Sequence, residues 1–159
     1  MSRLLHVSEA KLPVWLPNCC EACDTLGVMN NTPDAVVRQF ISLLVSRDIT
    51  TAATMVSNDF EYDNVPMGKA FGSQGLADTL TGFFGMCTGI DWEIVRQTTS
   101  GDTSAGIVLN ERNDKFEIHG RWVTLPVAGV FEIKDDLITL WRDYFDRATL
   151  LEAMTPPSP

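Results

Sequence analysis

The sequence predicts an α+β fold in which helices come first and then cover one face of a β-sheet. Apolar residues recur with helical spacing early in the chain, whereas from residue 91 onward they alternate with polar residues as in strands. Short turns separate these later segments, which is typical of antiparallel strands joined in sequence. A run of helices followed by a run of strands indicates a helix layer packed on one sheet.

The size and charge of the chain restrict what it can do. Its 159 residues, 45% hydrophobic and 21% charged, fit one globular domain. Acidic residues outnumber basic ones 21 to 12, for a formal net charge of −9, which argues against nucleic acid or an anionic membrane as partner. No apolar run is long enough to span a bilayer or to act as a secretory signal, so a cytoplasmic protein is expected.

Residues 1–30 lack a clear periodicity and are predicted to be an N-terminal extension. They carry Cys19, Cys20 and Cys23, and the last two have the spacing of a metal or redox pair. The sequence has no second cysteine pair and no suitably spaced histidine, so neither role is expected. The domain itself is predicted over 31–154, followed by a Pro-rich tail at 155–159.

The first ordered element is predicted to be a helix that starts at Pro33. Thr32 can cap it, and proline suits the first helical position. Its apolar stripe consists of Val36, Val37, Phe40, Ile41 and Leu44. The elements predicted after it are a short helix at 48–56, a strand at 60–65 and a helix at 76–84.

The second half is predicted to be a meander of strands. These strands are expected at 91–99, 105–118, 122–133 and 137–145, with turns at 100–102, 119–120 and 134–136. Asp146 then caps a short helix over 147–154.

Charged residues occur where the strand pattern predicts a buried face. Alternate residues of a strand share a face, so Arg112 and Asp114 share theirs with Val108, Phe116 and Ile118. Burying such charges costs several kcal/mol unless they are paired and hydrogen-bonded. These two residues therefore need polar partners from elsewhere in the fold.

Two other strands supply such partners. Asp143 lies on one face between Trp141 and Phe145, and Tyr62 and Asn64 share a face of the strand at 60–65. If these faces meet in one concave sheet, five polar side chains line one pocket: Tyr62, Asn64, Arg112, Asp114 and Asp143.

A structural ion pair or hydrogen-bond network would account for the burial of any one of these polar residues, but it accounts less well for the burial of all five. Two carboxylates facing one arginine leave a net charge, so desolvation and like charge favour protonation of one carboxyl. A pocket with one protonated and one ionised carboxyl is suited to acid–base catalysis.

Three segments resemble motifs of the limonene-1,2-epoxide hydrolase family. They are Tyr62-Asp63-Asn64, then Asn110-Glu111-Arg112-Asn113-Asp114, then Trp141-Arg142-Asp143-Tyr144-Phe145-Asp146. The resemblance covers roughly residues 31–154 and implies a cone-shaped, curved mixed β-sheet of the nuclear transport factor 2-like and ketosteroid isomerase type, with the N-terminal helices on its concave face. It also implies a homodimer.

The resemblance further implies an epoxide hydrolase that adds water in one step, without a covalent intermediate, a metal or an organic cofactor. Asp143 would be the general base, Tyr62 and Asn64 would hold the water, Asp114 would be the general acid and Arg112 would bridge both aspartates. Phe116 and Phe145, each two residues beyond an aspartate on the same face, are expected to wall a pocket for a cyclic or terpene-like epoxide.

Two alternatives remain open from the sequence. One is a ketosteroid isomerase or polyketide cyclase of the same fold, against which the Arg-x-Asp pair argues, because moving a proton on carbon needs no cation between two carboxylates. The other is a non-catalytic binding or dimer-forming module, since folds are reused for unrelated functions.

Overall fold

The computed structural model describes residues 31–156, which form one sheet covered by helices. The helices are α1 (Pro33–Val45), α2 (Ile49–Ala53), α3 (Gly72–Met86) and α4 (Arg147–Met154). The strands are β1 (Val56–Asn64), β2 (Gly68–Phe71), β3 (Gly89–Gly101), β4 (Ala105–Ile118), β5 (Arg121–Lys134) and β6 (Leu137–Phe145).

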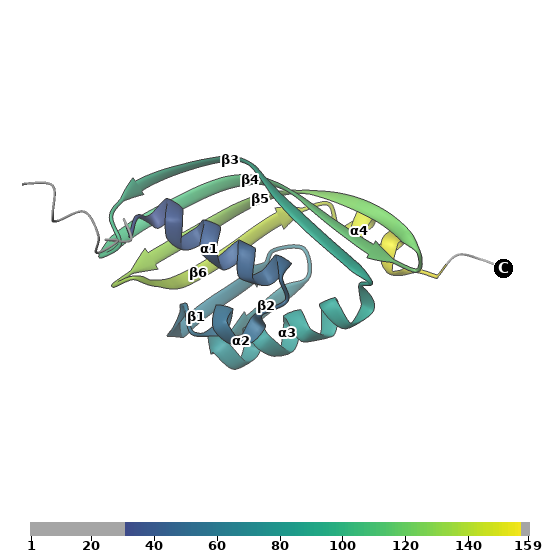
Figure 1. Ribbon diagram of the computed structural model, residues 1–159, viewed down its shortest axis with the longest axis horizontal. Helices are drawn as coiled ribbons and strands as arrows, with labels where there is room; N and C mark the ends of the chain where they lie inside the picture. Colours follow the sequence, from purple (N-terminus) through teal and green to yellow (C-terminus); the bar gives the residue numbers. More distant parts are fainter. Residues whose placement is uncertain (1–30, 157–159) are drawn as a thin grey trace, which may run out of the picture.

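The six strands form a mixed sheet in the order β2-β1-β6-β5-β4-β3. Strands β3 to β6 pair antiparallel in sequence order, whereas β1 runs parallel to β6. Figure 1 shows the long strands curving over α1, α2 and α3. The predicted α+β fold with a curved mixed sheet and N-terminal helices on its concave side is confirmed.

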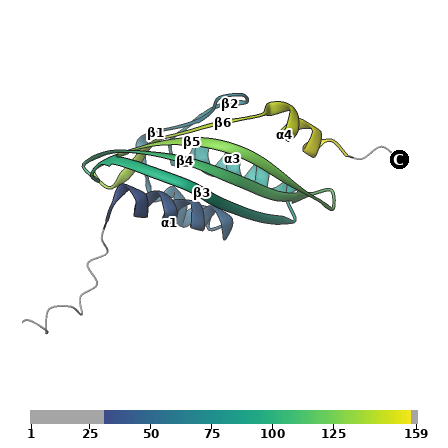
Figure 2. The same cartoon turned by 90° about the horizontal axis from the view of Figure 1, so that it is seen from above.

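Local signals in the sequence place α1. The Thr32 hydroxyl accepts a hydrogen bond from Ala35 N at 3.2 Å, and Pro33 occupies the first turn. The predicted apolar stripe is buried, and α1 packs against β3 and β4. The other long helix, α3, packs against β1 and β2, so the two helices cover different parts of the sheet (Figure 2).

Aromatic side chains fill the core between the helices and the sheet. Trp141 of β6 is fully buried and stacks on Tyr62 with a ring-centroid distance of 4.2 Å. It also contacts Phe40 of α1 and Phe131 of β5. The inward face of β6 therefore presents a hydrophobic residue directly beside the predicted site residue Asp143.

The structure differs from the sequence prediction mainly around β2. This strand pairs antiparallel with β1 in a short hairpin that the pattern did not predict, and α3 begins at Gly72 rather than at residue 76. Three glycines between residues 68 and 75 obscured both elements, because glycine carries neither an apolar pattern nor a helix preference.

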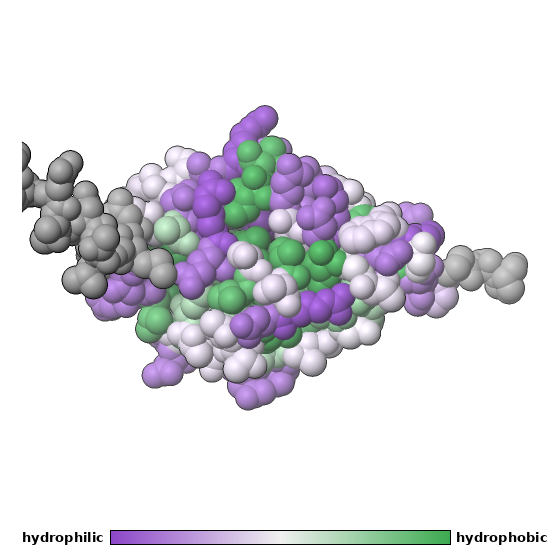
Figure 3. All heavy atoms as spheres, viewed as in Figure 1, coloured by the Kyte–Doolittle hydropathy of each residue, from purple (hydrophilic) through white to green (hydrophobic). Residues whose placement is uncertain are grey.

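Outside the core, the surface mixes hydrophilic and apolar residues (Figure 3). Among residues 31–156, no helix is long and apolar enough to cross a membrane. The cysteines at positions 19, 20 and 23 lie outside the described residues, as does the predicted extension.

Candidate active site

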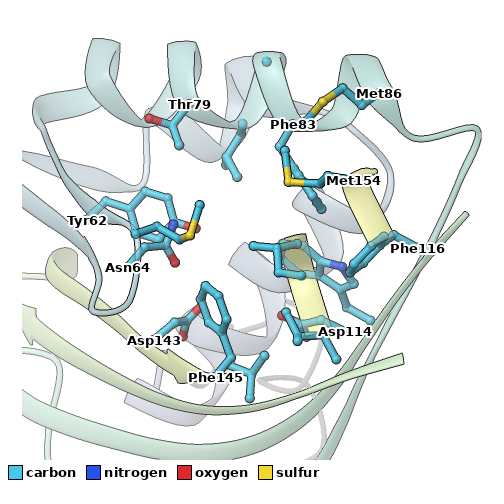
Figure 4. Close-up of a pocket in the computed structure, with 17 residues that line it drawn as sticks. Tyr62, Asn64, Thr79, Phe83, Met86, Asp114, Phe116, Asp143, Phe145 and Met154 are labelled. Atoms are coloured by element: carbon cyan, nitrogen blue, oxygen red, sulfur yellow. The ribbon is translucent and has the colours of Figure 1, made fainter. Parts of the chain in front are cut away.

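Three strands bring the five predicted polar residues together, but only four of them line the pocket, because Arg112 is fully buried and is not part of the lining. Tyr62 and Asn64 come from β1, Arg112 and Asp114 from β4, and Asp143 from β6. Parallel pairing of β1 with β6 sets Asn64 beside Asp143. In Figure 4, Tyr62, Asn64 and Asp143 lie along one side of the pocket and Asp114 along the other.

Arg112 links the two aspartates. Its Nε and Nη2 atoms each donate to Asp114, to Oδ1 and Oδ2 respectively, at 3.1 Å, and Nη2 also donates to Asp143 Oδ2 at 2.7 Å. The guanidinium is completely buried, and its carbon lies within 6 Å of the rings of Trp92, Phe131 and Trp141. This bidentate geometry suits the rigid fork of an arginine and could not be reproduced by a lysine.

Asp143 is held by two different donors. Trp141 Nε1 donates to Asp143 Oδ1 at 2.8 Å, while Arg112 holds the other oxygen. The Asp143 side chain is only 5% exposed, yet it lines the pocket together with Tyr62 and Asn64. Its orientation is therefore fixed while its surface toward the pocket remains available to a ligand.

Burial affects the ionisation of the site. Desolvation raises the pKa of Asp114 above its ordinary value of 3.8, although Arg112 acts in the opposite direction. Desolvation, and then the charge of Asp143, also raises the pKa of Tyr62, so its phenol stays neutral. Burial alone would lower the pKa of Arg112, but Asp143 and Asp114 outweigh it and raise that pKa.

The site extends further than the sequence prediction. Arg112 Nη1 donates to Asn110 Oδ1 at 3.1 Å, and Asn110 Nδ2 donates to Gln97 on β3. Gln97 in turn donates to Asp34 at the start of α1. Alternation along β4 puts Asn110 on the same face as Arg112. The contacts with Gln97 and Asp34 could not be predicted, because they join elements that are far apart in the sequence.

The pocket above these polar groups has a volume of about 280 Å³ and is largely apolar. Both Phe116 and Phe145 are part of its wall, as predicted from the sequence. Helices α3 and α4 contribute lining residues that were not predicted from the sequence: Thr79, Leu80, Gly82, Phe83, Met86, Leu150 and Met154. Helical periodicity could assign these to an inner face but could not show that the face borders a cavity.

Trp92 of β3 is another lining residue that the sequence did not indicate. It pairs with Asp114 across the strands, and its Nε1 is the one buried side-chain nitrogen or oxygen among residues 31–156 without a hydrogen-bond partner. Asp146, by contrast, accepts from Ala148 N and Thr149 N and caps α4 as expected.

A buried acid–arginine–acid network beneath an apolar pocket, on a curved sheet covered by helices, is an arrangement suited to acid–base chemistry on a small apolar molecule. The comparisons with known proteins identify the family. The family model described as the limonene-1,2-epoxide hydrolase catalytic domain matches residues 31–156. The chain belongs to the limonene-1,2-epoxide hydrolase family.

Individual relatives agree with this assignment. The chain is 34% identical over 110 residues to epoxide hydrolase EphG of Mycobacterium tuberculosis, covering 69% of this chain and 70% of that protein. A solved structure of an LEH-like epoxide hydrolase from M. tuberculosis has 32% identity and a TM-score of 0.63, covering 76% of this chain and 86% of that one. The predicted family is thus confirmed.

A more distant structure shows the fold alone. It is a hypothetical protein with a ketosteroid isomerase-like fold from Catenulispora acidiphila, with a TM-score of 0.68 and 19% identity. The match covers 80% of this chain and 99% of the chain of that structure. The likeness supports the predicted architecture but says nothing about chemistry.

Proposed function

We propose that this protein converts a cyclic or terpene-like epoxide of the limonene-1,2-epoxide type into a vicinal diol by direct attack of water. The observation that carries the proposal is the Arg112 bridge, which holds Asp114 and Asp143 in one buried network at the base of an apolar pocket. An acid and a base fixed in this way can act on the two ends of a C–O bond together.

On the base side, Asp143 takes a proton from the attacking water. Its oxygens already accept from Trp141 and Arg112, and its lone pairs toward the pocket remain for the water. Tyr62 and Asn64, beside Asp143 on the neighbouring strand, complete the water site. The water oxygen bonds to an epoxide carbon as its proton passes to Asp143.

On the acid side, Asp114 donates its proton to the epoxide oxygen as the C–O bond breaks. Its burial favours the neutral, proton-bearing form that this step requires. After the reaction Asp114 is ionised and Asp143 is protonated, so a proton must return to Asp114. The scheme includes no metal or organic cofactor, because the protonated carboxyl supplies the acid.

The walls of the pocket determine the proposed substrate class. Phe83, Phe116 and Phe145 together with the methionines of α3 and α4 offer apolar contact and few hydrogen-bond partners. Such a surface favours a compact hydrocarbon ring over a polar substrate. A panel of cyclic, terpene and aryl epoxides, with chiral analysis of the diols, tests this assignment.

A single turnover in ¹⁸O-labelled water tests the mechanism. With enzyme in excess over substrate, direct attack places the heavy oxygen in the first diol formed. Attack by an enzyme carboxylate would instead give a first diol containing light oxygen from the protein and would contradict the proposal. Enzyme pre-equilibrated through many turnovers in labelled water and returned to ordinary water is the matched control.

A further inference from the structure

Gly129 lies in the middle of β5, on the inward face of the sheet. Its neighbours on that face of the strand are the buried residues Val127 and Phe131. Across the sheet it pairs with Asn110 on β4 and with Asp143 on β6. The strand therefore lacks a side chain at the one point where its neighbours on both sides carry polar groups of the site.

Position 129 has no room for a side chain, although its backbone conformation would allow one. The glycines with positive φ among residues 31–156 are Gly68, Gly72, Gly101 and Gly120, so any residue could adopt the backbone at Gly129. A Cβ at this position, however, would overlap Arg112 Nη1 and lie 2.5 Å from Asn110 Oδ1 and 3.1 Å from Asp143 Oδ1. The guanidinium occupies the volume that a side chain would fill.

The atoms that a Cβ would meet are not free to move aside. Arg112 is fully buried and is tied to Asn110, Asp114 and Asp143. Because a guanidinium is planar and rigid, displacing Nη1 also displaces Nη2, the atom that donates to both aspartates. A methyl group on β5 would therefore change the relative position of the acid and the base.

We propose that Gly129 is a positioning residue for the proposed hydrolysis: its missing side chain creates the space that seats the Arg112 guanidinium between Asp114 and Asp143. The inference rests on the proposed function and concerns the same site. Gly129 is not among the residues that line the pocket, so it acts through Arg112 and does not touch the substrate.

Replacing Gly129 by alanine tests the inference. Gly129→Ala should lower kcat about 10- to 100-fold, because displacements of about 1 Å in a catalytic group have effects of this size, while KM changes less than about twofold. A kcat within about twofold of the wild type would overturn the proposal, as would a loss confined to KM.

Gly106 offers a matched control in a strand. A Cβ there would lie 2.6 Å from Asp102 O and 2.8 Å from Pro33 Cγ, so it is crowded to a similar degree but away from Arg112 and the aspartates. Gly106→Ala should lower the melting temperature and leave kcat per folded molecule unchanged. An equal loss of kcat in both variants would mean that crowding of the sheet alone, and not the seating of Arg112, causes the effect.

A second background distinguishes misplacement of Arg112 from misfolding. Asn110→Ala removes the atom that would lie 2.5 Å from the new Cβ and gives Nη1 space to shift. The loss in kcat and stability caused by Gly129→Ala should therefore shrink in this background. Equal losses in both backgrounds, or failure of Gly129→Ala to fold in both, would overturn the proposal. Either result would mean that crowding within the sheet, and not displacement of Arg112, causes the loss.

The wild-type assay separates failure of this inference from failure of the proposed function. If the wild type hydrolyses none of the epoxides in the panel, the proposed function fails. The seating of Arg112 by Gly129 is then tested by stability alone, that is, by whether Gly129→Ala destabilises the wild type more than it destabilises Asn110→Ala. If the wild type is active and Gly129→Ala matches it, the proposed function stands and the role of Gly129 is wrong.

Discussion

Arg112 joins two buried carboxyl groups that would repel each other if both were ionised. Its bonds to Asp114 and Asp143 fix their orientation, and the aromatic rings around it exclude solvent. The two aspartates have different surroundings, because both oxygens of Asp114 accept from Arg112 and burial raises its pKa, whereas Asp143 accepts from Arg112 and from the Trp141 N–H. The distinct roles proposed for them follow from these different surroundings.

Isosteric replacement of either aspartate should abolish hydrolysis. Asp114→Asn removes the transferable proton and Asp143→Asn removes the base, so each should lower kcat about 10²- to 10⁴-fold. An amide retains the shape but only one of the two acceptor oxygens, so each variant should be less stable than the wild type while its circular dichroism spectrum still shows the native fold. Substantial activity in either variant, measured per folded molecule, would show that its assigned role is wrong.

The protonation state of Asp114 should limit activity at high pH. Because its pKa is raised by burial, kcat/KM should fall as the pH rises through that value and the acid loses its proton. The native protein also holds a proton that the unfolded chain releases near pH 3.8, so stability should decrease with rising pH between the two pKa values.

Rate and denaturation measurements over a pH series check both expectations. The matched variant is Asp114→Asn, whose stability should lack the decrease assigned to this group. A flat alkaline profile in a protein that remains folded would contradict a protonated Asp114 as the acid.

Site residues that can be recognised from alternation within one strand were predicted from the sequence. Hydrogen bonds between different strands and helices were not. Arg112, Asp114 and Asp143 stood out because charge conflicts with an otherwise apolar face. The bonds from Asn110 through Gln97 to Asp34 could not be predicted, because they depend on how β3, β4 and α1 pack. The polar residues that form these bonds also occur commonly on exposed surfaces, so their type alone does not indicate a buried contact.

At the level of elements, α4 contributes both to stability and to the pocket. Asp146 caps its first turn, and Leu150 and Met154 of the same helix line the cavity. The cap was predictable from sequence, because an aspartate directly preceding a helical segment has a known local role. The contribution of the helix to the pocket was not, because it depends on how α4 folds back against β5.

Removing this cap should affect substrate binding more than chemistry. Asp146→Ala should lower the free energy of unfolding by about 1 kcal/mol, since the N–H groups of Ala148 and Thr149 lose their acceptor. Loosening α4 should raise KM, whereas kcat at saturation should stay within about threefold. Asp146→Asn, which can still cap the helix, is the control; a loss of kcat like that of Asp143→Asn would contradict this role.

For the whole molecule, the homodimer implied by the family resemblance remains a prediction. The outer face of the sheet carries a patch of apolar side chains: Ile107 and Leu109 on β4, Val130 on β5 and Tyr144 on β6. We propose that a second copy of the chain covers this patch, because scattered apolar residues are ordinary on a surface but adjoining ones on neighbouring strands mark contact sites.

Light scattering of the purified protein should therefore give the mass of two chains. Leu109→Lys should shift the protein toward the monomer, because it places a charge in the centre of the patch. Ser73→Lys, an exposed position on α3 away from this face, is the matched control and should leave the mass unchanged. A wild-type monomer at working concentrations would show that the prediction is wrong.

The parallel pairing of β1 with β6 has a consequence for biosynthesis. Tyr62 and Asn64 leave the ribosome early, whereas Asp143 belongs to the last strand made. A nascent or truncated chain that ends before residue 137 lacks β6, the strand that joins the β1–β2 hairpin to β5, and with it the proposed base. Catalytic competence should therefore arise abruptly, when the final strand inserts between β1 and β5.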